Sequence, residues 1–283
     1  MRTALFVVLV LSTGCVTQRE ACADGETFDH QDQVCTVYTE VAPVTTDVWT
    51  PAPGTTWQWQ LTGEINTTLA VDMYDVDLFE TPDAVFEALS DKTVICYFSA
   101  GSVESFREDA TGMPEEAVGD RLLGWGDERW LDVSNPAVFD MIERRLDLAV
   151  ERGCDGVEPD NVDGYRNRSG FPISSAEQLQ FNRFIADQAH MRSLSVGLKN
   201  DVDQLEELEP WFDWALNEEC HEFEECGTYT PFRRAGKAIF HTEYVSDFSR
   251  ADELADEVCV HSGFSTLVKL LDLGPQIVAC QPE

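Results

Sequence analysis

The chain has 283 residues, of which 43% are hydrophobic, and this composition excludes a disordered protein because it supplies enough apolar side chains for a large core. Its 19 basic and 53 acidic residues give a formal net charge of −34, which argues against nucleic acid as a partner because an acidic surface repels phosphate. Two interpretations of the acidity stay open: it solvates the surface, or it attracts a cationic polymer.

The first residues predict an export signal. A charged start precedes the apolar run Ala4–Leu11, which is too short to cross a bilayer as a helix. Small residues and then Cys15 follow, an order that resembles a bacterial lipoprotein signal with a lipidated cysteine. We predict a signal peptide at 1–14 and lipidation of Cys15, with ordinary cleavage as the alternative. The protein is then exported, and either lipid-anchored at the cell envelope or secreted, with the lipid as its only membrane contact.

The remaining eight cysteines are an even number, and disulfides persist in exported proteins. Plausible local pairs are Cys22 with Cys35, Cys220 with Cys226, and Cys259 with Cys280. Cys96 and Cys154 stay open, because each could be a buried free thiol. No cysteine has the CxxC spacing of a zinc site and the five histidines are scattered, so we expect no metal and no cofactor.

Residues 15–50 form a Cys-bearing N-terminal segment and linker before a single catalytic domain at 51–283. The stretch Thr36–Pro53 is rich in Thr, Val and Pro, which predicts an extended linker that holds the domain away from a membrane. About 230 residues follow from Gly54 onward, close to the roughly 250 of a (β/α)₈ barrel.

Strands and helices alternate along this domain. Eight runs rich in β-branched and aromatic residues predict strands at Trp57–Leu61, Leu69–Phe79, Thr93–Ser99, Gly156–Asn161, Ser195–Asn200, Trp214–Glu219, Ala238–Tyr244 and Ser265–Leu271. Helices are predicted at Pro82–Leu89, Pro136–Arg152, Ala176–Arg192 and Asp247–His261. The clearest, Pro136–Arg152, begins after a cap at Asn135 or Ser134 and ends at Gly153.

Alternating strands and helices predict an α/β fold with a parallel sheet, and eight strands predict closure into a (β/α)₈ TIM barrel. An open doubly wound sheet is the alternative, but no GxGxxG motif supports it. The long connection Gly101–Trp130 is expected to build the active-site face. Its Trp125 and Trp130 either stack on sugar rings or pack against the protein.

The stretch Gly153–Tyr165 (GCDGVEPDNVDGY) carries the strongest functional signal, because a strand ends there with acidic residues. Side chains alternate along a strand, so Glu158 and Asp160 share a face, with Asp160 at the barrel mouth and Glu158 one layer below. A calcium loop is the structural alternative, but the spacing of Asp160 and Asp163 misses the DxDxDG pattern.

Other polar residues end other predicted strands, and the ends of parallel strands converge on one mouth. These residues are Asp75, Asp77, Lys199, Asn200, Asn217, Glu218, Glu219, His241 and Glu243. Taken singly, each acid is equally well explained as a salt-bridged residue. A glycoside hydrolase needs one ionised and one protonated carboxyl group. We expect Lys199 to hold Asp160 ionised and a less polar setting to raise the pKa of Glu218.

At these residues the sequence resembles glycoside hydrolase family 114, the endo-α-1,4-polygalactosaminidases. The resemblance runs from about Trp49 to Val245. Its ordered blocks are WTPAPGTTWQWQL (49–61), MYDVDLF (73–79), VICYFSAGSVESFREDA (94–110), ERWLDV (128–133), GCDGVEPDNVDGY (153–165), VGLKN (196–200), NEEC (217–220) and FHTEY (240–244).

The resemblance implies a (β/α)₈ enzyme that cleaves α-1,4-linked galactosamine-rich polysaccharide. The family's catalytic Asp corresponds to Asp160 and its catalytic Glu to Glu218. The implied substrate-binding residues are Asp77, Tyr97, Lys199, Glu243 and Tyr244, and Glu158, where relatives often have Asp, joins them as a prediction.

A polymer of galactosamine with free amines is cationic, and it lacks the acetamido oxygen that substrate-assisted enzymes use as nucleophile. We therefore predict a retaining mechanism with Asp160 as nucleophile and Glu218 as acid/base. Three alternatives stay open: a non-catalytic carbohydrate-binding lipoprotein, a metal-dependent hydrolase suggested by His241 and Glu243, and a glycosidase that acts on a different α-linked sugar.

Overall fold

The structure is a computed structural model that describes residues 22, 26–29, 34–37, 42–260 and 263–280. The predicted signal peptide and Cys15 lie outside these residues. Within the described residues, no helix combines the length and the apolar character that crossing a membrane requires.

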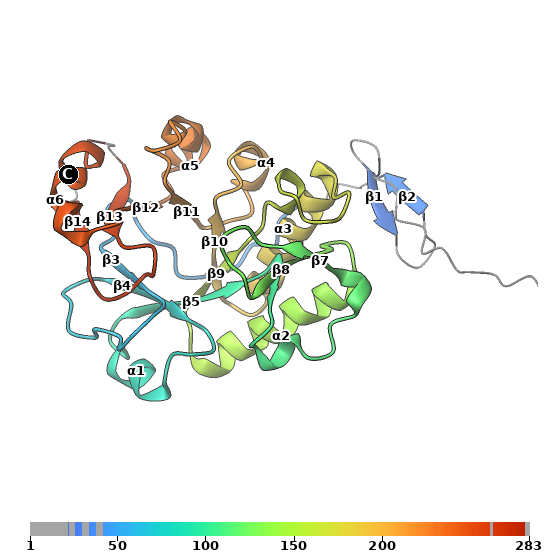
Figure 1. Ribbon diagram of the computed structural model, residues 1–283, viewed down its shortest axis with the longest axis horizontal. Coiled ribbons are helices and arrows are strands. Elements are labelled where there is room, and N and C mark those ends of the chain that lie inside the picture. The colour runs from blue at the N-terminus through green and yellow to red at the C-terminus, as the bar shows by residue number, and fades with distance from the viewer. Residues whose placement is uncertain (1–21, 23–25, 30–33, 38–41, 261–262, 281–283) are drawn as a thin grey trace, which may run out of the picture.

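Eight parallel strands form the centre of the molecule and follow one another in chain order (Figure 1). They are β3 (Trp57–Gln60), β4 (Met73–Asp77), β5 (Thr93–Ser99), β9 (Gly156–Asp160), β10 (Ser195–Lys199), β11 (Trp214–Glu218), β12 (Ile239–Tyr244) and β13 (Ser265–Lys269). Each lies within one of the eight predicted runs. The predicted α/β fold with a parallel sheet is thus confirmed. The short strand β14 (Val278–Ala279) pairs antiparallel with β13.

The sheet is curled, and its first strand contacts the segment around its last parallel strand. The Trp57 Nε1 atom donates to the Ser265 carbonyl at 2.9 Å, and the Leu61 amide donates to the Leu273 carbonyl at 3.0 Å. Within the described residues, however, no strand ladder joins β3 to β13. A fully closed (β/α)₈ barrel therefore stays a prediction.

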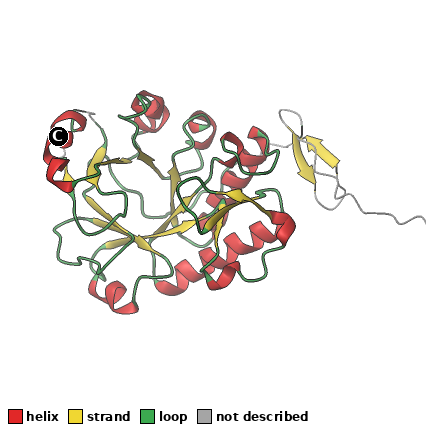
Figure 2. Cartoon of the chain, in the orientation of Figure 1, coloured by secondary structure: helices red, strands yellow, loops and turns green. Residues whose placement is uncertain are grey.

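Helices surround the sheet (Figure 2). The described residues form the α-helices α1 (Asp83–Ala88), α2 (Pro136–Arg152), α3 (Ser175–Met191), α4 (Leu205–Leu208), α5 (Thr230–Ala235) and α6 (Ala251–Val258). The predicted caps of α2 are confirmed, because the Asn135 side chain accepts from the Ala137 amide at 3.0 Å and Gly153 is left-handed at φ 80°. Helices α4 and α5 escaped prediction because they are too short for a clear apolar period.

The long connection after β5 is more ordered than the sequence suggested. It contains a three-stranded antiparallel sheet of β6 (Ser102–Glu104), β7 (Val118–Arg121) and β8 (Glu128–Leu131). Short 3₁₀ helices complete the described elements: η1 (Glu108–Ala110), η2 (Glu115–Ala117), η3 (Gly164–Arg166), η4 (Cys226–Tyr229) and η5 (Phe248–Arg250). We refer to residues 102–131 as the insertion.

A small N-terminal hairpin precedes the domain. Strands β1 (Glu26–Asp29) and β2 (Val34–Val37) pair antiparallel, and β1 packs against α3. Residues 42–53 form no helix or strand, as predicted for a linker, but they do not extend freely from the domain. The Val44 amide donates to Asp187 in α3 at 2.8 Å, so this part of the linker is held on the domain surface.

Four disulfides join the described cysteines. Three are the predicted local pairs, Cys22–Cys35, Cys220–Cys226 and Cys259–Cys280. The fourth, Cys96–Cys154, links β5 to a residue two positions before the start of β9 and settles the pairing that the sequence left open. It joins positions 58 residues apart, which sequence spacing alone does not pair.

Apolar side chains fill both faces of the curled sheet. The larger cluster lies between the sheet and its helices and includes Ile142 and Leu146 of α2. The smaller cluster fills the interior of the curled sheet and contains Trp57, Trp59 and Trp214. The interior is thus a packed base, and Asp77, Asp160, Lys199 and Glu218 stand at the carboxyl ends of their strands.

Candidate active site

Three neighbouring strands deliver the central charged residues at their last positions. Asp160 ends β9, Lys199 ends β10 and Glu218 ends β11. The residue after each one is left-handed, with φ 60° at Asn161, 46° at Asn200 and 61° at Glu219. The three strands therefore turn sharply at the same level, which leaves the three charged side chains at one opening.

A cavity of about 1110 Å³ lies over these strand ends. The strands contribute Trp59, Asp77, Tyr97, Asp160, Lys199, Glu218 and Tyr244 to its lining. The insertion covers another part of the cavity and contributes Glu104, Phe106, Arg107, Trp125 and Glu128. The expectation that the long connection builds the active-site face is thereby confirmed.

Lys199 is the centre of the charged cluster. Its Nζ atom lies 2.7 Å from Glu158 Oε1, 3.3 Å from Asp160 Oδ1 and 3.2 Å from Glu218 Oε2. Burial by itself lowers the pKa of Lys199, but the carboxylates of Asp160, Glu158 and Glu218 outweigh burial and raise it well above its ordinary value. The ammonium ion is therefore permanent, and it connects both predicted catalytic carboxylates.

Asp160 is held by groups from its own strand end and from β5. Its Oδ2 atom accepts from the Tyr97 hydroxyl at 3.1 Å, and its Oδ1 atom accepts from the Asn161 amide at 2.7 Å. Burial and the charge of Asp160 raise the pKa of Tyr97 well above its ordinary value, so this hydroxyl stays a donor. Gly101 packs on the same turn, where a Cβ atom would meet the Asn161 carbonyl at 1.8 Å.

Glu218 has a strongly polar setting, which differs from the less polar one expected from the sequence. Its Oε1 atom accepts a short hydrogen bond from the Tyr244 hydroxyl, and Oε2 accepts from Asn200 at 3.3 Å in addition to the contact with Lys199. Burial and the charge of Glu218 raise the pKa of Tyr244, so that hydroxyl also stays protonated. The difference arises because donors from β10 and β12 converge on a residue of β11.

The bottom of the cavity is a buried group of four residues that we call the floor: Trp59 and Lys199 line the cavity, and Asp75 and Glu158 are not part of the lining. All four side chains are at most 2% exposed. The Trp59 ring lies 4.6 Å from the Lys199 Nζ atom. The predicted position of Glu158 one layer below Asp160 is confirmed, but its full burial places it under the cavity lining rather than in it.

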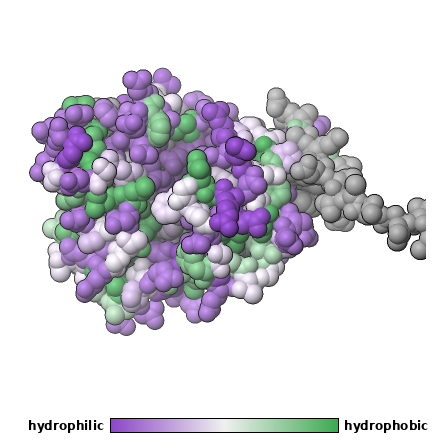
Figure 3. All heavy atoms as spheres, in the orientation of Figure 1, coloured by the Kyte–Doolittle hydropathy of each residue, from purple (hydrophilic) through white to green (hydrophobic). Residues whose placement is uncertain are grey.

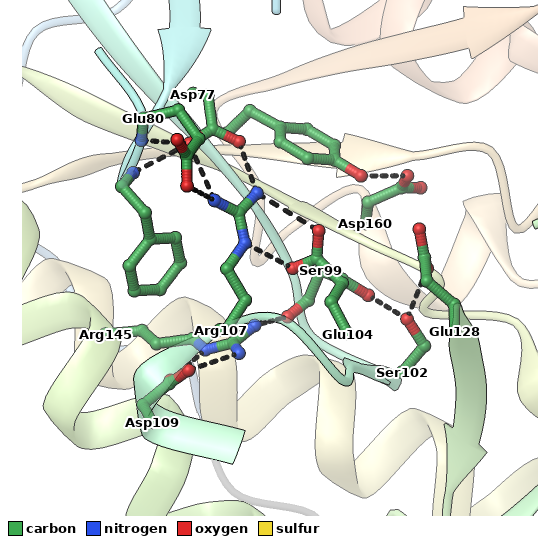
Figure 4. A network of polar contacts seen from close by, with 12 residues as sticks. Asp77, Glu80, Ser99, Ser102, Glu104, Arg107, Asp109, Glu128, Arg145 and Asp160 are labelled. Atoms are coloured by element: carbon green, nitrogen blue, oxygen red, sulfur yellow. Dashed lines mark hydrogen bonds and ion pairs between the residues drawn. The ribbon is translucent and has the colours of Figure 1, made fainter. Parts of the chain in front are cut away.

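Asp77 reaches the cavity, but its carboxylate is already engaged (Figure 4). Arg107 from the insertion donates to Asp77 Oδ2 at 2.6 Å and to both oxygens of Glu104 at 3.0 Å. The amides of Phe79 and Glu80 donate to Asp77 Oδ1 at 2.8 and 2.6 Å. This predicted substrate residue therefore ties the sheet to the insertion, which the sequence did not reveal.

Glu128 is a further acid at the cavity and comes from β8 of the insertion. Ser102 donates to Glu128 Oε2 at 2.8 Å, and the other carboxylate oxygen points toward Asp160 in Figure 4. Burial raises the pKa of Glu128 to about 7, against the lowering effect of the Ser102 hydrogen bond. Sequence analysis did not single out this residue, although it begins the ERWLDV block (128–133) of the resemblance.

Glu243, another predicted substrate residue, faces away from the cavity. Glu218 pairs in register with Thr242, so Thr242 and Tyr244 share the face of Glu218 and Glu243 points to the opposite one. Glu243 accepts from the His221 amide at 2.7 Å and contacts His241 Nε2 at 2.8 Å.

The suggested metal-dependent chemistry of His241 and Glu243 gains no support from this arrangement. His241 lies near Cys220 and Cys226, but these two sulfur atoms form a disulfide and are not free thiolates. The buried carboxylate of Glu243 instead fixes the chain just after the Cys220 position.

Apolar side chains mark the cavity mouth. Phe106, Leu123 and Trp125 of the insertion are 60%, 98% and 50% exposed, and Leu271 after β13 is 57% exposed. The surface in Figure 3 is otherwise mostly hydrophilic, with small hydrophobic patches between the polar residues. Trp130 is 6% exposed, so the packing alternative holds for Trp130 while Trp125 stays available to a ligand. We refer to Phe106, Leu123 and Trp125 as the rim.

The arrangement has the parts of an acid–base site. Two partly exposed carboxylates, Asp160 and Glu218, face one cavity and share one buried cation. Tyrosine hydroxyls fix the orientation of each carboxylate. Such a pair can protonate a leaving oxygen on one side and attack or activate water on the other.

Comparison with known proteins identifies a matching family and similar solved structures. The profile of glycoside-hydrolase family GH114 matches residues 38–283. The crystal structure of Aspergillus fumigatus Ega3 in complex with galactosamine is 37% identical, with a TM-score of 0.78 over 83% of this chain and 99% of that chain. The glycoside hydrolase domain of PelA from Pseudomonas aeruginosa is 14% identical, with a TM-score of 0.64 over 82% of this chain and 100% of that domain, and supports the fold alone. None of the curated proteins matches.

Proposed function

The chain belongs to glycoside hydrolase family GH114, and on this premise we propose that it cleaves α-1,4-linked galactosamine-rich polysaccharide with Asp160 as nucleophile and Glu218 as acid/base. That it is a glycoside hydrolase follows from the family and from its 37% identity to Ega3. The substrate and the roles of the two residues are the proposed part.

The observation that carries the proposal is the shared contact of two carboxylates with one ammonium group. Asp160 Oδ1 and Glu218 Oε2 lie 3.3 and 3.2 Å from the Lys199 Nζ atom. These two oxygens therefore cannot be farther apart than the lower end of the separation of about 6.5–9.5 Å that inverting enzymes need for a water molecule. This bound applies only to the two oxygens that face Lys199 and is compatible with the proposed retaining mechanism, in which the two carboxyl groups are about 5–5.5 Å apart; the anomer first released decides between retention and inversion.

The proposed reaction has two steps. Asp160 attacks the anomeric carbon while Glu218 gives its proton to the glycosidic oxygen, so the bond from carbon to that oxygen breaks as the bond to Asp160 forms. Glu218 then takes a proton from water, and the resulting hydroxide displaces Asp160 from the sugar. The Lys199 ammonium group contacts Asp160 at 3.3 Å, and the Tyr97 hydroxyl donates to its other carboxylate oxygen at 3.1 Å, so both hold the attacking group in place.

Charge supports an amino-sugar substrate. The cavity is lined by Asp160, Glu218, Glu104, Glu128 and Asp163, while the chain as a whole carries −34. A free galactosamine amine is cationic, and a cleft of this sign concentrates such a ligand. The relative Ega3 was crystallised with galactosamine, which is the same class of sugar.

The test compares wild type with Asp160→Asn and Glu218→Gln on partly deacetylated α-1,4-galactosaminan, with reducing ends counted over time. Each variant should lose about 10²–10⁴-fold in rate, because each removes a proton-transferring or attacking group. Glu222→Gln is the matched control, since it removes an exposed acid from the loop after Glu218. The anomer first released, followed by NMR, should retain the α configuration.

Equal rates for all four proteins would remove the assigned mechanism. No product from any of them, together with binding of the polymer, would favour the carbohydrate-binding alternative. Product from another α-linked polymer only would change the sugar and leave the mechanism in place.

We also propose that the protein is exported. Four disulfides among the described cysteines support this location, because disulfides persist outside the reducing cytosol. The signal peptide at 1–14, the alternative fates of Cys15, the boundary of the domain at residue 51 and full barrel closure remain part of this proposal. Mass spectrometry of the mature N-terminus distinguishes a lipid-modified Cys15 from ordinary cleavage.

A further inference from the structure

The floor holds more negative charge than its cation can balance. Asp75, Glu158, Asp160 and Glu218 all interact with Lys199, and both Asp75 and Glu158 are fully buried. Four carboxylates beside one ammonium ion leave three charges uncompensated. Burial of unpaired charge is costly enough that such groups take up protons instead.

Strand register places Asp75 at the bottom of this cluster. Asp75 pairs with Ile95 of β5, and Ile95 pairs with Gly156 of β9. Glu158 is two residues further along β9 on the same face, so it lies one level above Asp75. Gly156 has no side chain to separate the two acids, and Lys199 lies above Glu158 at the cavity.

The buried carboxyl oxygens reveal where a proton is needed. Among the described residues, no N–H or hydroxyl group donates to either oxygen of Asp75 or to Glu158 Oε2. Glu158 Oε1 is the oxygen that contacts Lys199 at 2.7 Å. Buried polar atoms are nearly always hydrogen-bonded, and a proton on one of the two acids would form a hydrogen bond that pairs one oxygen of Asp75 with Glu158 Oε2.

We propose that Asp75 carries this proton at neutral pH, donates it in a hydrogen bond to Glu158 Oε2, and through Glu158 positions Lys199 between Asp160 and Glu218. The inference deepens the proposed function and rests on it only for its kinetic part. Asp75 is a positioning residue, because it lies beneath the cavity and acts through Glu158 and Lys199.

The titration behaviour agrees with this direction of the hydrogen bond. Burial first, and then the charge of Glu158, raise the pKa of Asp75 well above its ordinary value. Burial raises the pKa of Glu158 to about 7, while Lys199 and the contact with Asp75 lower it. The contact between the acids thus favours the proton on Asp75 and the charge on Glu158. The other titratable groups that act on the pair are Asp160, Tyr97 and Tyr244.

Infrared difference spectroscopy tests the proton without substrate. The spectrum of wild type minus Asp75→Asn at neutral pH should contain the carbonyl stretch of a protonated carboxyl group. Glu128, whose pKa is also raised, is present in both proteins and cancels in the difference. A difference spectrum that contains only ionised carboxylate bands overturns the proposal, whether or not the enzyme acts on galactosaminan.

Kinetics test the positioning role. Asp75→Leu removes the donor and should lower kcat by about 10²-fold with little change in KM, as expected when catalytic groups shift by about 1 Å. Asp75→Asn keeps a donor toward Glu158 and should retain the larger part of kcat. Asp213→Leu is the structural control, because Asp213 lies just before the amino end of β11, where it contacts His190 and the Val196 amide.

Two kinetic outcomes overturn the proposal. One is wild-type kcat in a folded Asp75→Leu protein, and the other is an equal loss in folded Asp75→Asn and Asp75→Leu proteins. If Asp75→Leu does not fold, the Asp75→Asn rate and the infrared band decide. An inactive wild type with a clear protonated band refutes the proposed substrate and leaves the shared proton in place.

Discussion

The floor and the rim of the cavity are built in different ways. Floor residues come from four of the parallel strands, β3, β4, β9 and β10, are at most 2% exposed and hold paired charges such as Lys199 with Glu158. Rim residues come from one insertion and expose apolar side chains to solvent, with Leu123 at 98% and Trp125 at 50%.

This difference indicates that the charges held in a fixed geometry and the side chains available to contact a ligand belong to different parts of the enzyme. Charges that must keep a fixed geometry lie where burial forces them to stay paired. The side chains that we propose to contact the polysaccharide are exposed, where they can adapt to it. Arg107 links the parallel sheet to the insertion that carries the rim, because it contacts Asp77 of β4 and Glu104 of the insertion. Variants of floor residues should therefore change stability and kcat, whereas variants of rim residues should change KM.

The largest effect is expected from Lys199→Met. Three carboxylates lose their common cation, and breaking a buried ion pair costs about 3–5 kcal/mol of stability. Urea unfolding measures this loss, and activity should fall with it. Arg250→Met is the control, since it breaks the exposed pair with Glu253 and should cost below about 1 kcal/mol. Similar losses of stability for Lys199→Met and Arg250→Met would contradict the conclusion that paired, buried charges hold the floor in place.

The next largest effect is expected from the disulfide that links the central strands. Replacing both Cys96 and Cys154 by Ala opens a link between β5 and the start of β9, and we expect a loss of about 2–4 kcal/mol in the free energy of unfolding. The kcat of the folded protein should change little, because neither cysteine lines the cavity. The matched pair Cys259 and Cys280 is only 21 residues apart in sequence. Its replacement should lower the free energy of unfolding by less, because a shorter cross-linked loop restricts the unfolded chain less. A larger cost for that outer pair would contradict the assignment of rigidity to the central strands.

Glu128→Gln tests the insertion through the pH dependence of its stability. Burial raises the pKa of Glu128 from 4.5 to about 7, so the wild type loses stability as pH rises from below 4.5 through 7. The glutamine variant does not titrate and should be more stable near pH 8, by about 2–4 °C in Tm, with the advantage gone near pH 4. Calorimetry near pH 8 and near pH 4 measures the Tm of the wild type and of the variant. Glu116→Gln, an exposed acid of the same insertion, should show no such pH-dependent difference.

The smallest effect is expected from Trp125→Ala. Loss of one stacking ring at the rim should raise KM for the polymer by about 3- to 10-fold and leave kcat unchanged. Short oligosaccharides that occupy only the site near Asp160 should show wild-type kinetics. Phe223→Ala removes an exposed aromatic ring (64% exposed) that is not in the cavity lining and serves as the control. If kcat of Trp125→Ala fell as much as that of a floor variant, the floor and the rim would not have separate roles.

The sequence by itself determined the strand positions and the central residues. Each of the eight parallel strands falls within its predicted run, because apolar and β-branched runs are a local signal. Asp160 and Glu218 followed from their places at strand ends and from the family blocks. Alternation along one strand also placed Glu158 below Asp160.

Only the tertiary structure decided which face each strand turns inward and which groups meet across strands. Register between β11 and β12 turned Glu243 outward, and the layering of β4 with β9 placed Asp75 under Glu158. The insertion sheet also escaped prediction, since its strands have three or four residues and pair only with one another. The physical reason is common to all three cases: a local pattern fixes the period of a strand, whereas burial and pairing energies depend on residues far away in the chain.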